Sequence, residues 1–154
     1  MSDQEYQVPP ESERIPAQEL RRKIADKEIE EAKKAAEKAR DQDEGKRKAY
    51  LEFMERQFTE ADRVRIRRQI EKAAERGLFE FEILRFPAEY LEDHGRRINN
   101  GDPDWQLSLT GYGKRCCEAF KDLAQPQGYK LIARVLNYPR GMIGDIGLYV
   151  SWKG

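Results

Sequence analysis

Arginine is the residue type whose number and spacing best suit a chemical role in this chain, the binding of phosphate. A guanidinium holds phosphate with two parallel hydrogen bonds, so several arginines on one helix could bind nucleic acid. Acidic residues such as Asp62 and Glu71 are interleaved with them, however, and this pattern favours a solvated, salt-bridged helix face. The arginines are Arg63, Arg65, Arg67, Arg68, Arg96 and Arg97, of which Arg63, Arg67 and Arg68 are the candidate phosphate contacts.

Two loops offer further groups that could bind a ligand. The stretch from Gly141 to Gly147 is rich in glycine and could present backbone N–H groups to a phosphate, but it lacks the Lys-Ser/Thr ending of a P-loop. A hairpin loop that needs positive φ angles explains the same glycines. The stretch from Asn99 to Trp105 offers oxygen ligands for a hard cation, yet its spacing differs from an EF-hand loop and fits Asx turns. A small-ligand or enzyme site built from both loops is one alternative.

The other reactive side chains do not form a catalytic set. His94 is the only histidine, and nothing in the sequence places a nucleophile near it. Cys116 and Cys117 are adjacent, which favours packing over redox chemistry and, with one histidine, gives poor zinc ligation. The sequence therefore predicts no catalytic residue, no cofactor and no metal, and it favours a protein that is not an enzyme.

A dense group of large apolar residues lies near the middle of the chain. Three of them share one face of a helix, while Leu51 and Phe53 point away from that face, so two separate contacts are expected. This many apolar side chains are typical of a contact surface. We predict self-association or binding of a protein partner here, with a homodimer as the first expectation. The candidate partner interface consists of Tyr50, Leu51, Phe53, Met54 and Phe58.

The first third of the chain is strongly polar. Residues 1–15 contain several acids, Pro9 and Pro10, which predicts a disordered tail. Residues 16–58 are dense in Ala, Glu, Lys and Arg, which predicts a helical arm roughly 60 Å long. A thin apolar stripe without a strict heptad makes this arm either a weak coiled coil or a helix that stands in water. The stripe consists of Leu20, Ile24, Ile29, Ala32, Ala36 and Ala39.

Residues 59–154 predict a compact domain that folds on its own. Thr59 and Asp62 form a capping box that starts a helix, and Gly77 ends it. A strand is expected from Leu78 to Phe86, with Phe79, Phe81 and Ile83 on one face, and a helix from about Leu109. The predicted fold class is α+β: a three-stranded, mainly antiparallel sheet with helices on one face, preceded by the long N-terminal helical arm.

The C-terminal stretch from Gly128 to Trp152 is the clearest structural signal. Two runs of β-branched, aromatic and aliphatic residues flank a loop at residues 140–145, which predicts a β-hairpin. In the second run Ile146, Leu148, Val150 and Trp152 fall on one face. We therefore expect Trp152, the largest of the four, to anchor the core.

Composition excludes some classes of protein. The 154 residues include 29 basic and 29 acidic ones, and this balance argues against a dedicated nucleic-acid coat or a polybasic membrane binder. No apolar run is long enough for a membrane span, and the N-terminus lacks the layout of a secretion signal. We expect a cytoplasmic protein with reduced cysteines.

Several segments of the C-terminal half resemble short bacterial proteins of unknown function. The similar segments are the run that follows His94 (Gly-Arg-Arg-Ile-Asn-Asn-Gly-Asp-Pro-Asp-Trp), Gly-Tyr-Lys-Leu at residues 128–131, Gly-Met-Ile-Gly-Asp-Ile-Gly at residues 141–147, and the final Ser-Trp. The resemblance covers roughly the last half of the chain. It implies a self-standing C-terminal domain and no catalytic residue.

Three hypotheses follow, in order of preference. The first is a non-enzymatic interaction or accessory protein that self-associates or docks on a partner through its helical arm. The second is a nucleic-acid-associated accessory protein that binds weakly through the arginine-bearing helix. The third is a small-ligand binder or enzyme that uses the two loops described above.

Overall fold

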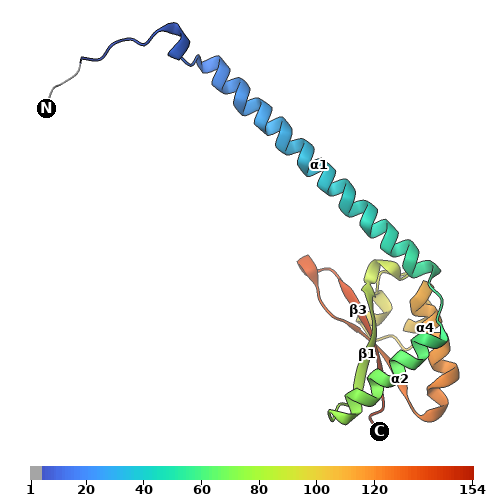
Figure 1. Cartoon of the computed structure of the whole chain (residues 1–154). Coiled ribbons are helices and arrows are strands. Elements are labelled where there is room, and N and C mark those ends of the chain that lie inside the picture. Colours follow the sequence, from blue (N-terminus) through green and yellow to red (C-terminus); the bar gives the residue numbers. More distant parts are fainter. Residues whose placement is uncertain (1–4) are drawn as a thin grey trace. The chain divides into compact units, whose positions relative to one another are not determined.

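The computed structural model describes residues 5–154 (Figure 1). Contacts divide the chain into two units, one that ends at Arg47 and one that spans Lys48–Gly154. The helices and strands are α1 (Ala17–Glu55), α2 (Glu60–Glu75), β1 (Glu80–Pro87), α3 (Arg96–Asn100), α4 (Gly111–Leu123), β2 (Lys130–Val135) and β3 (Asp145–Ser151). Short 3-10 turns connect several of these elements. The last residues of the predicted arm, from Lys48 onward, thus belong to the second unit.

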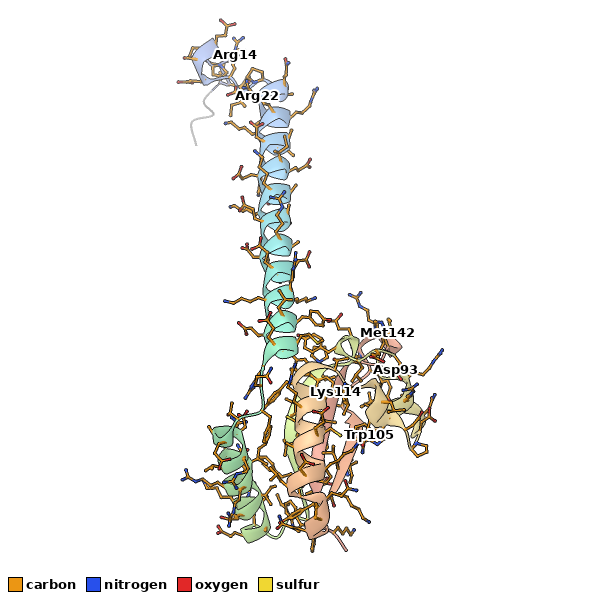
Figure 2. All side chains as sticks on the ribbon, turned by 90° about the vertical axis from the view of Figure 1, so that its right-hand side faces the viewer. Arg14, Arg22, Asp93, Trp105, Lys114 and Met142 are labelled. Carbon is orange, nitrogen blue, oxygen red and sulfur yellow. The ribbon has the colours of Figure 1, made fainter. Side chains whose placement is uncertain are left out.

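Helix α1 is 39 residues long, and none of its residues is buried. Its Ala, Glu, Lys and Arg residues favour the helix through their intrinsic propensity. Figure 2 shows side chains leaving this helix on every side. Before α1, residues 5–15 form one short 3-10 turn at Glu11–Glu13 and are exposed except for the half-buried Pro9. The predicted disorder of this segment stays a prediction.

The second unit contains the predicted α+β fold, with a three-stranded antiparallel sheet in the order β1-β3-β2. Strand β3 is central and pairs on one side with β1, for example Phe86 with Ile146, and on the other with β2, for example Val135 with Ile146. The predicted hairpin is therefore β2 and β3. Because both neighbours of β3 are antiparallel to it, no parallel crossover is needed.

One local detail of the sheet differs from the predicted alternation. The sequence pattern placed Phe79, Phe81 and Ile83 on a common face, but the pairing register shifts between Glu82 and Leu84. Ile83 is the extra residue of a β-bulge there, so the face that it and its neighbours present is re-set. Beyond the bulge, Leu84 and Phe86 pair with core residues of β3.

The hydrophobic core lies on one face of the sheet, where the helices pack. Ile146 and Leu148 of the central strand have no exposed surface. The buried residues around them come from β1, from the segment between β1 and α4, and from α4: Phe86, Ala88, Leu91, Ile98, Leu109 and Cys117. Trp152 follows the end of β3 and is only half-buried beside Tyr129, so the middle of the strand, and not its last tryptophan, anchors the core.

The opposite face of the sheet carries an ion pair instead of a helix. Arg134 of β2 binds the carboxylate of Glu80 of β1, with Nη2 of the arginine 2.7 Å from one carboxylate oxygen. The same guanidinium lies 4.6 Å from the ring centre of Tyr149 on the strand between them. A cation over an aromatic face is attractive, so these three side chains cover the centre of that face.

Candidate functional site

The candidate interface residues at the end of α1 belong to the second unit and lie mainly against its other residues. The ring of Phe53 packs against Phe86, Tyr90 and Tyr112, with its centre 4.9 Å from that of Tyr90. Tyr50 makes an edge contact with the same Tyr90 ring. Phe53 therefore contacts the core of its own chain, although the helical pattern suggested that it points to a second contact.

The remaining members of the group differ in exposure. Leu51 keeps 45% of its surface exposed and Tyr50 keeps 40%, whereas Met54 and Phe58 are half-buried. Met54 lies against Gly111, the first residue of α4. Leu51 is thus the member most available to a partner, and a partner contact by the group stays a prediction.

Two features of α4 hold the end of α1 in place. The Arg115 guanidinium donates hydrogen bonds to the backbone carbonyls of Met54, at 2.8 Å, and Arg56, at 3.0 Å. The Met54 carbonyl is in the last turn of α1 and the Arg56 carbonyl directly follows it, where no intrahelical donor remains, and a cation there also complements the helix dipole. Gly111 approaches so closely that a Cβ atom on it would lie 2.8 Å from the Met54 Cα and from the Phe53 carbonyl oxygen.

Asp62 forms a buried charged centre at the start of α2. Its carboxylate accepts a hydrogen bond from the backbone N–H of Thr59, and the Thr59 hydroxyl accepts one from the Asp62 N–H, which completes the predicted capping box. Arg56 and Arg65 also bind this carboxylate, at 3.2 and 3.0 Å. The side chain of Asp62 is 6% exposed, while those two guanidiniums are about half exposed.

These partners decide the protonation of Asp62. Burial by itself raises the pKa of the carboxyl, but the Thr59 N–H and the positive charges of Arg56 and Arg65 oppose this effect, and the net pKa is lowered. Asp62 is therefore a carboxylate at neutral pH. It joins the segment after α1 to α2 through ionic and backbone hydrogen bonds.

The three candidate phosphate contacts on α2 do not form one basic face. Arg63 pairs with Glu60 and Arg67 pairs with Glu71, both on the same helix. Arg63 and Arg67 line a cavity beside α4, whereas Arg68 lines a separate depression together with Lys72. Arg97, further along the chain, lies near Asp93 and Asp104. Most arginines of α2 are thus ion-paired, and they are distributed around the helix, as in the solvated, salt-bridged helix face that the sequence favoured.

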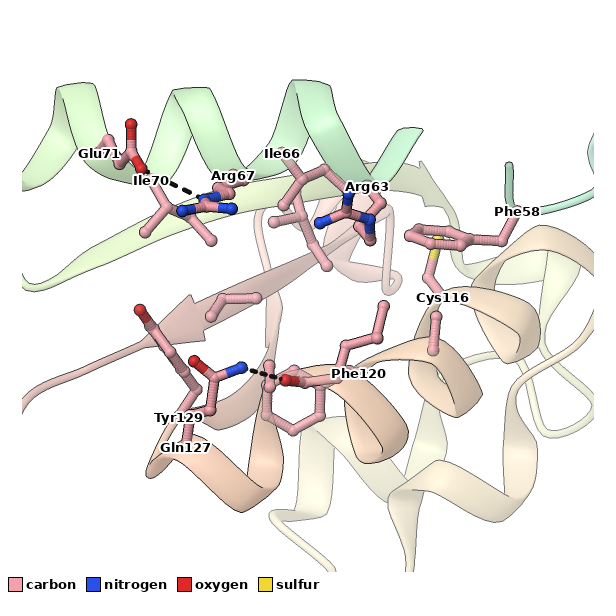
Figure 3. A pocket seen from close by; sticks show the side chains of 15 residues that line it. Phe58, Arg63, Ile66, Arg67, Ile70, Glu71, Cys116, Phe120, Gln127 and Tyr129 are labelled. Carbon is pink, nitrogen blue, oxygen red and sulfur yellow. Dashed lines mark hydrogen bonds and ion pairs between the residues drawn. The ribbon is translucent and has the colours of Figure 1, made fainter. Parts of the chain in front are cut away.

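The cavity beside α4 has a mainly apolar lining (Figure 3). It has a volume of about 410 Å³ and lies between α2 and α4, with residues of β1 and β3 also in its wall. Aliphatic and aromatic residues make up most of the lining, and Arg63 and Arg67 lie on the α2 side while Tyr129 and Gln127 lie on the other. We call this space the α2/α4 cavity.

The two cysteines lack the thiolate form at neutral pH. Burial raises the pKa of Cys116, which lines the α2/α4 cavity, to about 11, and burial also raises the pKa of Cys117. Both thiols are therefore protonated at neutral pH, and the thiolate is the reactive form. In the described chain they are free, and they pack as small hydrophobic groups.

The two loops named from the sequence do come together. Asn99 and Asn100 share an open depression of about 710 Å³ with residues 141–145 of the hairpin loop. The Tyr138 hydroxyl donates a hydrogen bond of 2.6 Å to Asn99 Oδ1, which links the loops. His94 lies in the same depression with φ of 56°, in the left-handed region. Among residues 5–154, no group of three or more acidic, histidine or cysteine side chains could hold a metal ion.

Sequence reasoning missed the residues that act across elements. Arg115 follows a lysine on a helix that contains both acidic and basic residues. The sequence around it does not indicate that it binds carbonyls 59 and 61 residues away. Gly111 appears in a turn-rich stretch, and only the close approach of α1 gives it a role. Asp62 was recognised as a cap, and the nearby Arg56 was the available signal for its ion pair.

No helix in residues 5–154 is long and apolar enough to cross a membrane. Comparisons of the chain with protein-family models, with curated proteins and with solved structures found no match.

Proposed function

We propose that this chain is a non-enzymatic interaction protein whose helical arm, residues 17–47 of α1, binds a second copy of itself. One observation carries the proposal: no residue of α1 is buried, although Ile29, which is 55% exposed, lies on one side of the helix with Ala25, Ala32, Ala36 and Ala39. Most long helices in proteins are stabilised by packing of an apolar face rather than by propensity alone. A second arm would supply that packing.

A second row of residues on α1 ends in opposite charges, and this favours an antiparallel pair. Seven residues follow one another at alternating steps of three and four, and we call them the arm stripe: Arg22, Ala25, Ile29, Ala32, Ala36, Ala39 and Asp43. Alternating steps of three and four place residues on one side of a helix. A parallel pair would set Arg22 against Arg22 and Asp43 against Asp43. An antiparallel pair centred on Ala32 places Arg22 at the height of Gln42, one residue from Asp43, at both ends.

The charges along the arm, most of which lie away from the stripe, are complementary in the same orientation. In an antiparallel pair centred on Ala32, residues whose numbers add up to 64 lie at the same height along the two helices. Wherever both of these residues are charged, their signs are opposite. The pairs are Arg21 with Asp43, Lys23 with Asp41, Asp26 with Lys38, Lys27 with Glu37, Glu30 with Lys34, and Glu31 with Lys33. Opposite charge at each height favours this partner and orientation over others.

Charge reversal tests both the partner and the orientation. In an antiparallel pair, Arg22→Glu sets two acidic residues together at each end of the stripe and is expected to weaken dimerisation about ten-fold, or about 1.4 kcal/mol. The double variant Arg22→Glu/Asp43→Arg restores opposite charges and should recover the affinity. Sedimentation equilibrium of the full-length protein over a range of concentrations measures the dimer dissociation constant.

Lys34→Glu is the matched control, because it makes the same change of charge on the side of α1 away from the stripe and should alter the affinity less. A wild-type protein that stays monomeric at tens of micromolar would reject self-association and leave a foreign protein as the partner. Failure of the double variant to recover would reject the antiparallel orientation.

A second candidate function is the binding of a small polar ligand in the depression between the two loops. The observation in its favour is that Asn99, Asn100 and residues 141–145 line one hollow, which could present amide and backbone groups to a ligand. Nucleic-acid binding has less support, because the arginines of α2 are paired and do not form one face.

A further inference from the structure

We propose that the α2/α4 cavity binds a small amphipathic carboxylate, such as a medium-chain fatty acid, with its chain inside and its carboxylate at Arg63 and Arg67. This inference does not depend on the arm or on dimerisation, because every lining residue lies in the second unit. The cavity volume of about 410 Å³ falls within the range of known small-molecule sites.

The walls of the cavity suit a hydrocarbon chain. Ile66 and Ile70 project from α2, and Phe120 lies on α4 across from them (Figure 3). Leu123 of α4 also lines the cavity. Leu123 keeps 45% of its surface exposed, so apolar area remains that an alkyl chain would remove from water. Cys116 adds no charge, because burial raises its pKa to about 11.

The polar groups of the cavity define the charge of the ligand. Arg63 and Arg67 contribute two positive charges on the α2 side, and the Tyr129 hydroxyl is a further donor in the lining. Glu71 is the one carboxylate in the lining, and Arg67 Nε already lies 3.3 Å from it. An anion is therefore a better fit to this rim than a cation or a neutral alcohol.

The present partners of the two arginines are exchangeable. Glu60 is 72% exposed and Glu71 is 61% exposed, so both ion pairs are open to water. Exposed ion pairs contribute little to stability, because water solvates the separated charges well. A carboxylate whose chain is already held in the cavity would be at a high effective concentration beside both guanidiniums and could replace Glu60 or Glu71 there.

Isothermal titration of the full-length protein with decanoate tests the assignment, with decan-1-ol as the uncharged probe. We expect saturable binding of decanoate, and binding about ten-fold weaker in Arg63→Gln/Arg67→Gln. Arg68→Gln is the matched control on the same helix outside the cavity and should leave the affinity unchanged. Decan-1-ol should bind to the wild type more weakly than decanoate does. Its affinity for the double variant should equal its affinity for the wild type, because it carries no charge.

A second variant keeps the test sound if the arginine changes disturb α2. Ala119 is half-buried and lines the cavity from α4, so Ala119→Trp should fill the space and abolish decanoate binding while circular dichroism stays that of the wild type. Absence of saturable binding to the wild type would overturn the proposal. Binding that Ala119→Trp leaves intact would place the ligand outside the cavity and would also overturn the proposal. Both outcomes are independent of dimerisation through the arm.

Discussion

Replacing Gly111 with alanine is expected to destabilise the second unit by about 3 kcal/mol, a large effect for one methyl group. The new Cβ would lie 2.8 Å from the Met54 Cα and the Phe53 carbonyl oxygen, and these are backbone atoms that cannot rotate away. Gly111 also has φ of 51°, in the left-handed region that costs other residues roughly 1 kcal/mol. Urea unfolding of the full-length protein measures the loss.

The same change should loosen the end of α1. Phe53 packs against Phe86 and Tyr90 only while the backbones of α1 and α4 stay in contact, so hydrogen exchange of the amides at residues 50–55 should become faster.

Gly113→Ala is the matched control, two residues further along the same helix. Its Cβ would meet the Phe53 Cζ at 3.4 Å, an ordinary contact, and Gly113 does not have a positive φ. Alanine is a better helix former than glycine, so the stability of this variant should be close to that of the wild type or higher. Equal unfolding midpoints for Gly111→Ala and Gly113→Ala would show that α1 does not press on α4 as described.

Replacing Asp62 with alanine should also cost about 3 kcal/mol. The change removes the side-chain half of the capping box, and it removes a buried carboxylate that accepts bonds from Thr59, Arg56 and Arg65. Glu60→Ala is the control on the same turn of α2, because Glu60 is largely exposed and should matter far less. Urea unfolding at pH 7 compares the two variants.

Asp62 should also make stability depend on pH in acid. Its pKa is lowered in the folded protein from an ordinary value of 3.8, so the folded state binds this proton less readily than the unfolded chain. The stabilisation is therefore complete above the unfolded pKa and is lost as the pH falls through the lower folded pKa. The difference in free energy of unfolding between the wild type and Asp62→Asn should be constant from pH 7 to about pH 5 and should shrink below about pH 4. A difference that grows in acid would contradict the ion-pair assignment.

Much of the fold could be predicted from local patterns. The alternation of Ile146, Leu148 and Val150 with smaller or polar residues indicated the last strand, and all three are buried on one face. Thr59 and Asp62 signalled the start of α2, and the capping box is present. These predictions hold because propensity, capping and hydrophobic periodicity act over a few residues, which is the range that a sequence displays directly.

The bulge in β1 shows where local pattern fails. Alternation alone set Phe79, Phe81 and Ile83 together, but the partner strand decides the register, and one extra residue at Ile83 shifts it. Similarly, size and face made Trp152 the expected anchor, whereas it lies beyond the end of β3 and the middle of that strand is covered by helices.

The sequence by itself determined the α+β class, the long charged helix and the order of its elements, because each depends on neighbours in the chain. Only the tertiary structure decided what the candidate residues contact: Phe53 against its own core, Arg63 and Arg67 beside the α2/α4 cavity, and Asn99 next to the hairpin loop. Arg115 donates to carbonyls about sixty residues away in the chain. Gly111 is needed because a Cβ atom at this position would lie 2.8 Å from the backbone of Met54 and Phe53. Such contacts depend on the path of the whole chain, so no window of sequence contains both partners.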